Sequence, residues 1–227
     1  MKRSTERILT THAGSLPRPA DLLEMMAGGA ADRARDRPAY AARVRRAVAE
    51  VVEKQVAHGL DVIDDGEMGK PSFVTYVTER LRGFEPSPEP GELPWAGSKE
   101  VTAFPEFYES TLRQSPNAAA PRFACTGPVS YAGHAEVRAD IDNLKAALAG
   151  VEVEEAFIPA ISPSNVEGRQ KNLHYRTDEE YLFAIADAMR EEYTAIADAG
   201  FLVQIDDPRL VTYYIMNPRS TVPECRR

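Results

Sequence analysis

The chain has 227 residues, a formal net charge of −8 and 43% hydrophobic residues. This composition is typical of a globular protein and excludes disorder over the whole chain. The acidic balance disfavours nucleic acid and anionic membrane surfaces as partners. No apolar run reaches the roughly 20 residues of a membrane span, and the N-terminus does not resemble a secretory signal. The two cysteines, Cys125 and Cys225, lie far apart in the sequence. We therefore expect the protein to be located in the reducing cytoplasm and to have no disulfide framework.

Short apolar runs alternate along the chain with amphipathic helices. We expect helices at 19–26, 36–58, 72–81, 140–148 and 177–199, and strands at 8–13, 60–64, 122–126, 156–161 and 201–205. Such alternation predicts a parallel sheet with helices outside it, in a (β/α) barrel or a doubly wound sheet. No glycine-rich dinucleotide fingerprint follows the first expected strand, which favours the barrel.

Several residues mark where the expected helices begin and end. Asp36 is a candidate N-cap and Pro38 fits the first turn of the same helix. Gly59 and Gly200 are the expected stops, each directly before an apolar strand. The stretch 85–121 is rich in proline, and we expect it to form a loop or subdomain over the mouth or edge of the barrel.

The number of strands falls short of a complete barrel. Five strand signals are visible, whereas a (β/α)₈ barrel needs eight. A further helix start at Thr221 is followed by only a few residues. We therefore expect an α/β protein of the TIM-barrel type with about the first five βα units, 1–227 being the N-terminal portion of one barrel. A partner chain or self-association would complete it, or the chain is a fragment.

The first candidate site residues lie at the end of the first expected strand. His12, Ala13, Gly14 and Ser15 would lie at the end of a barrel that carries active sites. Gly14 lets the backbone approach a ligand closely, and the Ser15 hydroxyl can hydrogen-bond a carboxylate. The alternative interpretation is a simple turn.

Two acidic clusters follow two other expected strands. Asp64, Asp65 and Glu67 come after one of them, and Asp206 and Asp207 after the other. Carboxylates held close together favour a cation, such as a substrate ammonium, a metal or an arginine. The alternatives are a solvated acidic loop for the first cluster and helix capping for the second.

These motifs resemble the cobalamin-independent methionine synthase family, especially its short members. The matching elements are Thr10 to Pro19, Gly59 to Glu67 with Gln55, Thr126 to Val129, and Tyr181 to Pro208. The resemblance implies a (β/α)₈ barrel that transfers an alkyl group to a thiol activated by zinc.

The resemblance also implies roles for individual residues. Ser15 and the backbone at Ala13 would hold the carboxylate or amino group of homocysteine, while Glu67 and Asp206 would pair with its ammonium. Secondary candidates are His12, Arg18, Asp65 and Asp207. The family's zinc ligands include a His-x-Cys pair, and this chain has none. We therefore assign no metal ligand in this chain, although zinc is the cofactor that the family implies.

The leading functional hypothesis is a zinc-dependent methyltransferase of methionine biosynthesis, which converts homocysteine to methionine with a 5-methyltetrahydrofolate-type donor. One alternative is another thiol alkyltransferase of the family, such as one that opens epoxides with coenzyme M. Retention of Glu67 and Asp206 favours an amino-acid thiol, because coenzyme M has no ammonium. A uroporphyrinogen decarboxylase would need more arginines than Arg18. The alternative from another class is a non-catalytic amino-acid-binding subunit or pseudoenzyme.

Overall fold

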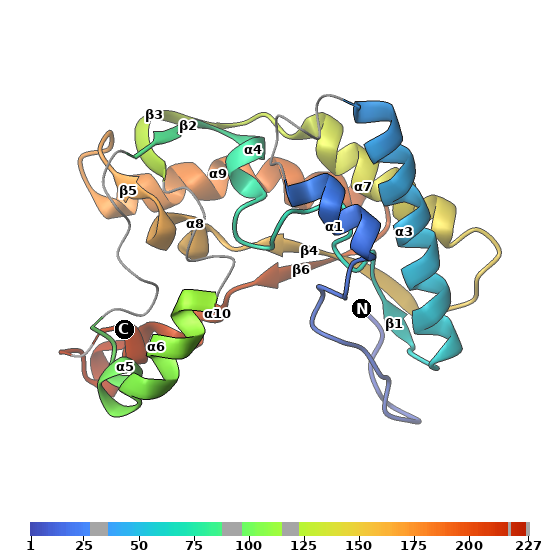
Figure 1. Ribbon diagram of the computed structural model, residues 1–227, viewed down its shortest axis with the longest axis horizontal. Helices are drawn as coiled ribbons and strands as arrows, with labels where there is room; N and C mark the ends of the chain where they lie inside the picture. Colours follow the sequence, from blue (N-terminus) through green and yellow to red (C-terminus); the bar gives the residue numbers. More distant parts are fainter. Residues whose placement is uncertain (28–35, 88–96, 115–122, 218, 226–227) are drawn as a thin grey trace. The chain divides into compact units, whose positions relative to one another are not determined.

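The computed structural model describes residues 1–27, 36–87, 97–114, 123–217 and 219–225 (Figure 1). This part of the chain forms two compact units. Unit 1 comprises Met1–Arg80, Tyr131–Ile161 and Ala188–Asp206, and unit 2 comprises Leu81–Ser130, Ser162–Asp187 and Asp207–Arg227. None of the helices in these ranges is long and apolar enough to cross a membrane.

Unit 1 contains a parallel sheet of three strands in the order β1-β4-β6 (Figure 1). The strands are β1 (Val62–Ile63), β4 (Glu155–Ile161) and β6 (Leu202–Asp206). In the register of this sheet, Ala156 lies beside Ile63, and Ile161 lies beside Asp206. The expected strands at 60–64, 156–161 and 201–205 are thus confirmed: β4 and β6 end side by side, whereas β1 ends beside the start of β4.

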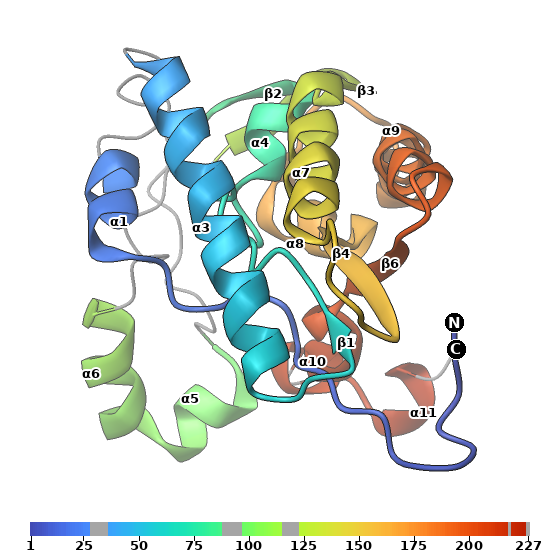
Figure 2. The same ribbon diagram turned by 90° about the vertical axis from the view of Figure 1, so that its right-hand side faces the viewer.

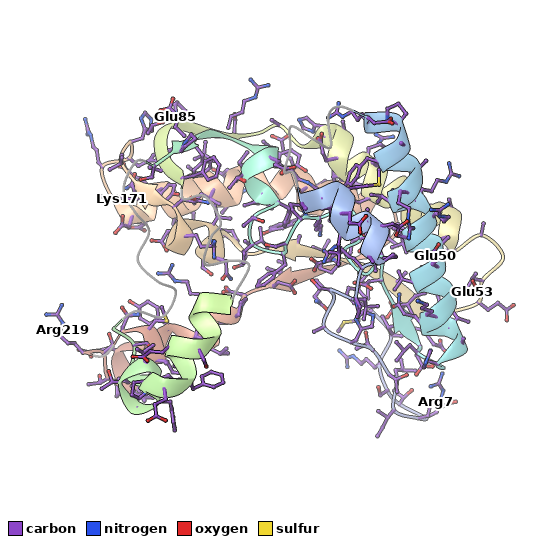
Figure 3. All side chains as sticks on the ribbon, viewed as in Figure 1. Arg7, Glu50, Glu53, Glu85, Lys171 and Arg219 are labelled. Carbon is purple, nitrogen blue, oxygen red and sulfur yellow. The ribbon has the colours of Figure 1, made fainter. Side chains whose placement is uncertain are left out.

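Two helices of unit 1, α3 (Arg37–Ala57) and α7 (His134–Ala147), pack against each other (Figure 2). Asp36 caps α3 by accepting a hydrogen bond from the Ala39 amide at 3.1 Å. The buried residues of α3 are Arg43, Val44, Ala47, Val48, Val51, Val52 and Gln55. Glu53 points away from these residues into solvent (Figure 3). The remaining helices of unit 1 are α1 (Ala20–Ala27), α4 (Val77–Arg80) and the second half of α9 (Asp178–Asp198).

Unit 2 has its own sheet in the order β2-β3-β5, with β3 and β5 parallel. Its strands are β2 (Leu81–Pro86), β3 (Phe123–Tyr131) and β5 (Lys171–Asn172), and its helices are α5 (Lys99–Ala103), α6 (Pro105–Gln114), α8 (Pro163–Arg169), α10 (Pro208–Met216) and α11 (Val222–Cys225). The described residues therefore form an α/β protein with small sheets and no closed barrel, as expected for an incomplete barrel.

Two predicted elements are wrong. Residues 8–13 form no strand. The Thr10 amide donates a hydrogen bond to the Asp61 side chain at 2.7 Å and not to the backbone of a neighbouring strand. The helix expected over 72–81 shortens to α4. The Ser72 hydroxyl accepts the Val74 and Thr75 amides instead, a side-chain bond that competes with helix formation.

The proline-rich stretch is only partly described. Helices α5 and α6 lie within it, but residues 88–96 and 115–122 are outside the described residues. The sequence did not predict α5, α6, α8, α10, β2 or β5.

Candidate functional site

The N-terminal segment reaches the site at Gly14, which is buried and has φ +135°. A Cβ atom at this position would lie 3.1 Å from Glu67 Oε1 and 3.2 Å from Pro159 Cγ. A side chain here would therefore both strain the backbone and press on its neighbours. Glycine allows three segments of unit 1, the N-terminus, the turn after β1 and β4, to meet at one point.

The turn after β1 folds back on itself through its own carboxylates. Asp64 Oδ1 accepts the Gly66 amide at 2.8 Å, and Asp65 Oδ1 accepts the Glu67 amide at 2.9 Å. Gly66 has φ +63° and Glu67 has φ +55°, a left-handed conformation that is uncommon outside glycine. Strain of this kind collects at functional sites. Its effect here is to bury the Glu67 side chain, which is 1% exposed.

His12 and Gln55 hold the start of this turn. His12 Nε2 lies 2.7 Å from Gln55 Oε1 and 3.3 Å from Asp64 Oδ1. Gln55 also accepts the Asp64 amide at 3.0 Å and donates to the Asp64 carbonyl at 2.9 Å. The hydrogen bond with Asp64 raises the pKa of His12. His12 Nδ1 accepts the Gly14 amide at 3.2 Å, so the same ring orients the N-terminal segment.

The fourth carboxylate of the site, Asp206, lies at the end of β6. Gln204 Nε2 donates to the Ala13 carbonyl and to Asp206 Oδ1, the latter at 2.8 Å. Asp206 is partly buried, whereas Ala13 and Ser15 are exposed. The Ser15 hydroxyl hydrogen-bonds Glu67 and lowers its pKa, opposing the effect of burial. The structure thus brings together Ala13, Ser15, Glu67 and Asp206, the four residues that the sequence analysis placed first.

We call Asp64, Asp65, Glu67 and Asp206 the carboxylate cluster. Burial raises the pKa of Asp65 to about 7, and it also raises the pKa of Glu67 and of Asp206. Each of these three groups is further raised by another carboxylate of the cluster. Burial and mutual repulsion therefore disfavour the ionised forms of these three carboxyl groups, and a bound cation would favour them.

Two oxygens of the cluster are buried and unsatisfied. Asp64 Oδ2 and Glu67 Oε2 have no hydrogen-bond partner among the described residues. A buried acceptor without a donor costs roughly 1–3 kcal/mol, and more for a charged group. A cationic ligand with several N–H groups would satisfy such oxygens and neutralise the charge.

Lys70 and Arg18 are the cations beside the cluster. Arg18 Nη2 donates to the Glu67 and Lys70 carbonyls at 2.8 and 2.7 Å. This predicted site residue therefore holds the backbone of the turn and does not contact its carboxylates in this way. Lys70 is 1% exposed, and its ammonium donates to the Pro159 carbonyl.

Asp207, a secondary candidate, directly follows Asp206 and belongs to unit 2. It is the N-cap of α10 and accepts the Leu210 amide at 3.1 Å, together with the Ser164 hydroxyl at 2.7 Å. This is the capping alternative that the sequence left open.

The described residues do not fit a zinc site. Among them, no group of three or more His, Cys, Asp or Glu side chains is arranged to hold a metal ion. Cys125 is buried within β3, and its thiol donates to the Gly127 carbonyl at 3.3 Å.

Sequence reasoning missed Lys70 and Gln204 and gave Gln55 no role. Gln204 had a visible signal, because residues two apart on a strand point to the same face and Asp206 was already a candidate. Lys70 follows Glu67 by three residues, but only the turn geometry shows that its ammonium is buried.

Comparisons with known proteins place the sequence pattern in context. The model of the family described as cobalamin-independent synthase, catalytic domain, matches residues 8–156. A methionine synthase from Saccharolobus solfataricus is 27% identical over 207 residues, which are 89% of this chain and 53% of that protein. A 5-methyltetrahydropteroyltriglutamate–homocysteine methyltransferase from Streptomyces avermitilis is 39% identical over 75 residues, 33% of this chain and 10% of that protein. The chain spans about half the length of the Saccharolobus relative.

Solved structures show the same fold at lower identity. A putative vitamin-B12-independent methionine synthase from Listeria monocytogenes has a TM-score of 0.60 at 21% identity, covering 98% of this chain and 59% of that one. A B12-independent methionine synthase from Shewanella sp. W3-18-1, solved with selenomethionine, has a TM-score of 0.56 at 19% identity, covering 78% of this chain and 45% of that one.

Proposed function

Because the chain belongs to the family of cobalamin-independent synthase catalytic domains, we propose that its carboxylate cluster binds a thiol amino acid, homocysteine, as the acceptor of a methyl group. Methionine is then the product. The observation that carries this proposal is the buried Glu67 side chain, whose Oε2 has no partner among the described residues and which lies close enough to Asp206 for each charge to oppose the other. An α-ammonium would neutralise two such carboxylates and donate hydrogen bonds to both.

The roles of the individual residues follow from their positions. Glu67 and Asp206 would accept hydrogen bonds from the ammonium, and the exposed Ser15 hydroxyl and the backbone at Ala13 would meet the carboxylate end of the amino acid. Gln204 orients Asp206 and ties it to the Ala13 carbonyl. Gln55 and His12 fix Asp64 behind them. Such positioning lowers the cost of ordering the ligand.

The methyl donor that we propose is of the 5-methyltetrahydrofolate type, supported by the name of the Streptomyces relative. The zinc ion implied by the family has no ligand set among the described residues, so we derive no step through it. A coenzyme M acceptor is disfavoured, because its sulfonate would face a cluster of carboxylates.

The test is calorimetric titration of the chain with L-homocysteine and L-methionine. Glu67→Gln and Asp206→Asn should each weaken binding at pH 7.5 by about tenfold or more, since a hydrogen bond to a charged group contributes roughly 1.5–3 kcal/mol. Glu53→Gln is the matched control, because Glu53 is exposed on the outer face of α3 (Figure 3), and it should leave affinity unchanged.

Unchanged affinity in both cluster variants would contradict the assignment. Coenzyme M and L-norleucine serve as competitors that separate the hypotheses. Norleucine keeps the α-amino acid group and should bind, whereas coenzyme M lacks the ammonium and should not.

A further inference from the structure

One buried cation faces the carboxylate cluster from within the protein. Lys70 is 1% exposed, and its ammonium lies 4.7 Å from the centroid of the Tyr76 ring. A lysine is almost never fully buried unless it is paired. Its electrostatic effect extends to Asp65, Glu67, Asp206 and Glu192, in each case favouring the charged carboxylate.

The contacts of Lys70 connect the two halves of the cluster. Its ammonium donates to the Pro159 carbonyl in β4. Pro159 lies beside Gln204 in the register of the sheet, and Gln204 donates to Asp206. On the other side, the Lys70 amide donates to the Glu67 carbonyl at 3.1 Å. Lys70 is thus connected to Glu67 through the turn and to Asp206 through the strands.

From this geometry we propose that Lys70 is a positioning residue of the amino-acid site, whose buried ammonium is the fixed counter-charge of Glu67 and Asp206. The proposal rests on the proposed function for its ligand, but the counter-charge itself can be measured without one. Lys70 does not touch the amino acid. It acts through the two carboxylates that do.

The counter-charge has a pH-dependent consequence. Glu67 and Asp206 bind an ammonium only when ionised, so affinity is present above their pKa values and is lost as pH falls through them. An opposite charge nearby lowers a carboxyl pKa by about 1–3 units. Removal of the Lys70 charge should therefore move the loss of affinity to higher pH. The polar and charged groups around the two carboxylates are Ser15 and Arg18 on the N-terminal segment, Asp64, Asp65 and Lys70 in the turn, and Gln204 on β6, with Tyr76, Asp140 on α7, Glu192 on α9 and His12 around these.

The experiment compares Lys70→Met, which keeps an apolar stem without charge, with Lys70→Arg, which keeps the charge. Affinity for L-methionine is measured by calorimetry from pH 5.5 to 8.5, after circular dichroism has shown that each variant is folded. We expect Lys70→Met to bind about tenfold more weakly than wild type at pH 6.5 and to recover by pH 8.5. Lys70→Arg and the exposed-lysine control Lys145→Met should keep the wild-type midpoint.

A loss of affinity by the same factor at every pH would mean that Lys70 acts only structurally, and an unchanged profile would mean that it has no role. Either result overturns the proposal. A second measurement needs no ligand. In protein with ¹³C-labelled carboxyl groups, Glu67 and Asp206 should titrate at higher pH in Lys70→Met and in Lys70→Gln than in wild type, and midpoints that do not move in either variant would contradict the counter-charge. Absence of methionine binding by wild type would instead overturn the proposed function and leave the carboxyl titration to decide the role of Lys70.

Discussion

At the scale of single residues, the site depends on backbone conformations that few side chains tolerate. Gly14 lies at φ +135°, and any Cβ atom there would contact the Glu67 carboxylate. Glu67 itself occupies the left-handed region. The unusual backbone therefore falls on residues of the proposed amino-acid site, as expected where strain serves function.

Gly14→Ala should separate strain from crowding. We expect a loss of roughly 1 kcal/mol of stability from the backbone and a loss of methionine affinity of about tenfold, because the new methyl group displaces Glu67. Gly150→Ala is the matched control, since Gly150 also has positive φ, +80°, but open space around it. Its stability should fall by a similar amount without any change in affinity. Equal affinity in both variants would show that Gly14 does not shape the site.

At the scale of secondary-structure elements, a buried ionic network joins three helices of unit 1. Arg80 in α4 pairs with Asp140 in α7 at 2.6 Å and with Glu192 in α9 at 3.2 Å. Tyr76 and Tyr131 donate to Glu192 at 2.8 and 2.6 Å. Burial alone would raise the pKa of Glu192, but Arg80 and the other donors bring it below its ordinary value. The network thus keeps a buried carboxylate charged beneath the site.

Arg80→Met should destabilise the protein strongly, because it leaves two buried carboxylates without their cation. The expected loss is about 3–5 kcal/mol in urea unfolding. Arg46→Met removes an exposed pair with Glu50 on α3 and should cost less than about 1 kcal/mol. Similar losses in the two variants would argue that the network contributes no more than a surface pair.

The elements also show how far the sequence alone could lead. Strands β1 and β6 of unit 1 were predictable, because apolar runs between a glycine stop and an acidic pair have few other solutions. The carboxylates at their ends were predictable for the same reason. The conformation of segment 8–13 was not predictable. Its β-branched pattern is typical of a strand, but its Thr10 amide hydrogen-bonds the Asp61 side chain. The Lys70 counter-charge was also beyond reach, because a lysine after a glycine-rich turn is usually solvated.

At the scale of the whole molecule, the chain has a net charge of −8, and part of that charge is concentrated in the carboxylate cluster. Burial raises the pKa of Asp65 to about 7 and also raises that of Glu67 and Asp206. The folded protein therefore takes up protons at the site as pH falls toward neutrality. Binding of a cation opposes this uptake, so it should be accompanied by proton release and should weaken as pH falls.

If this chain holds an amino acid through the carboxylate cluster, added L-methionine should change the amide resonances of the residues around that cluster. Amide ¹H–¹⁵N spectra of the labelled protein would be recorded at pH 7.5 while L-methionine is added. We predict saturable shifts concentrated at Gly14, Ser15, Gly66, Glu67 and Asp206, with a weaker affinity when the titration is repeated at pH 6. Absence of shifts at millimolar methionine, or shifts confined to other residues, would contradict the account.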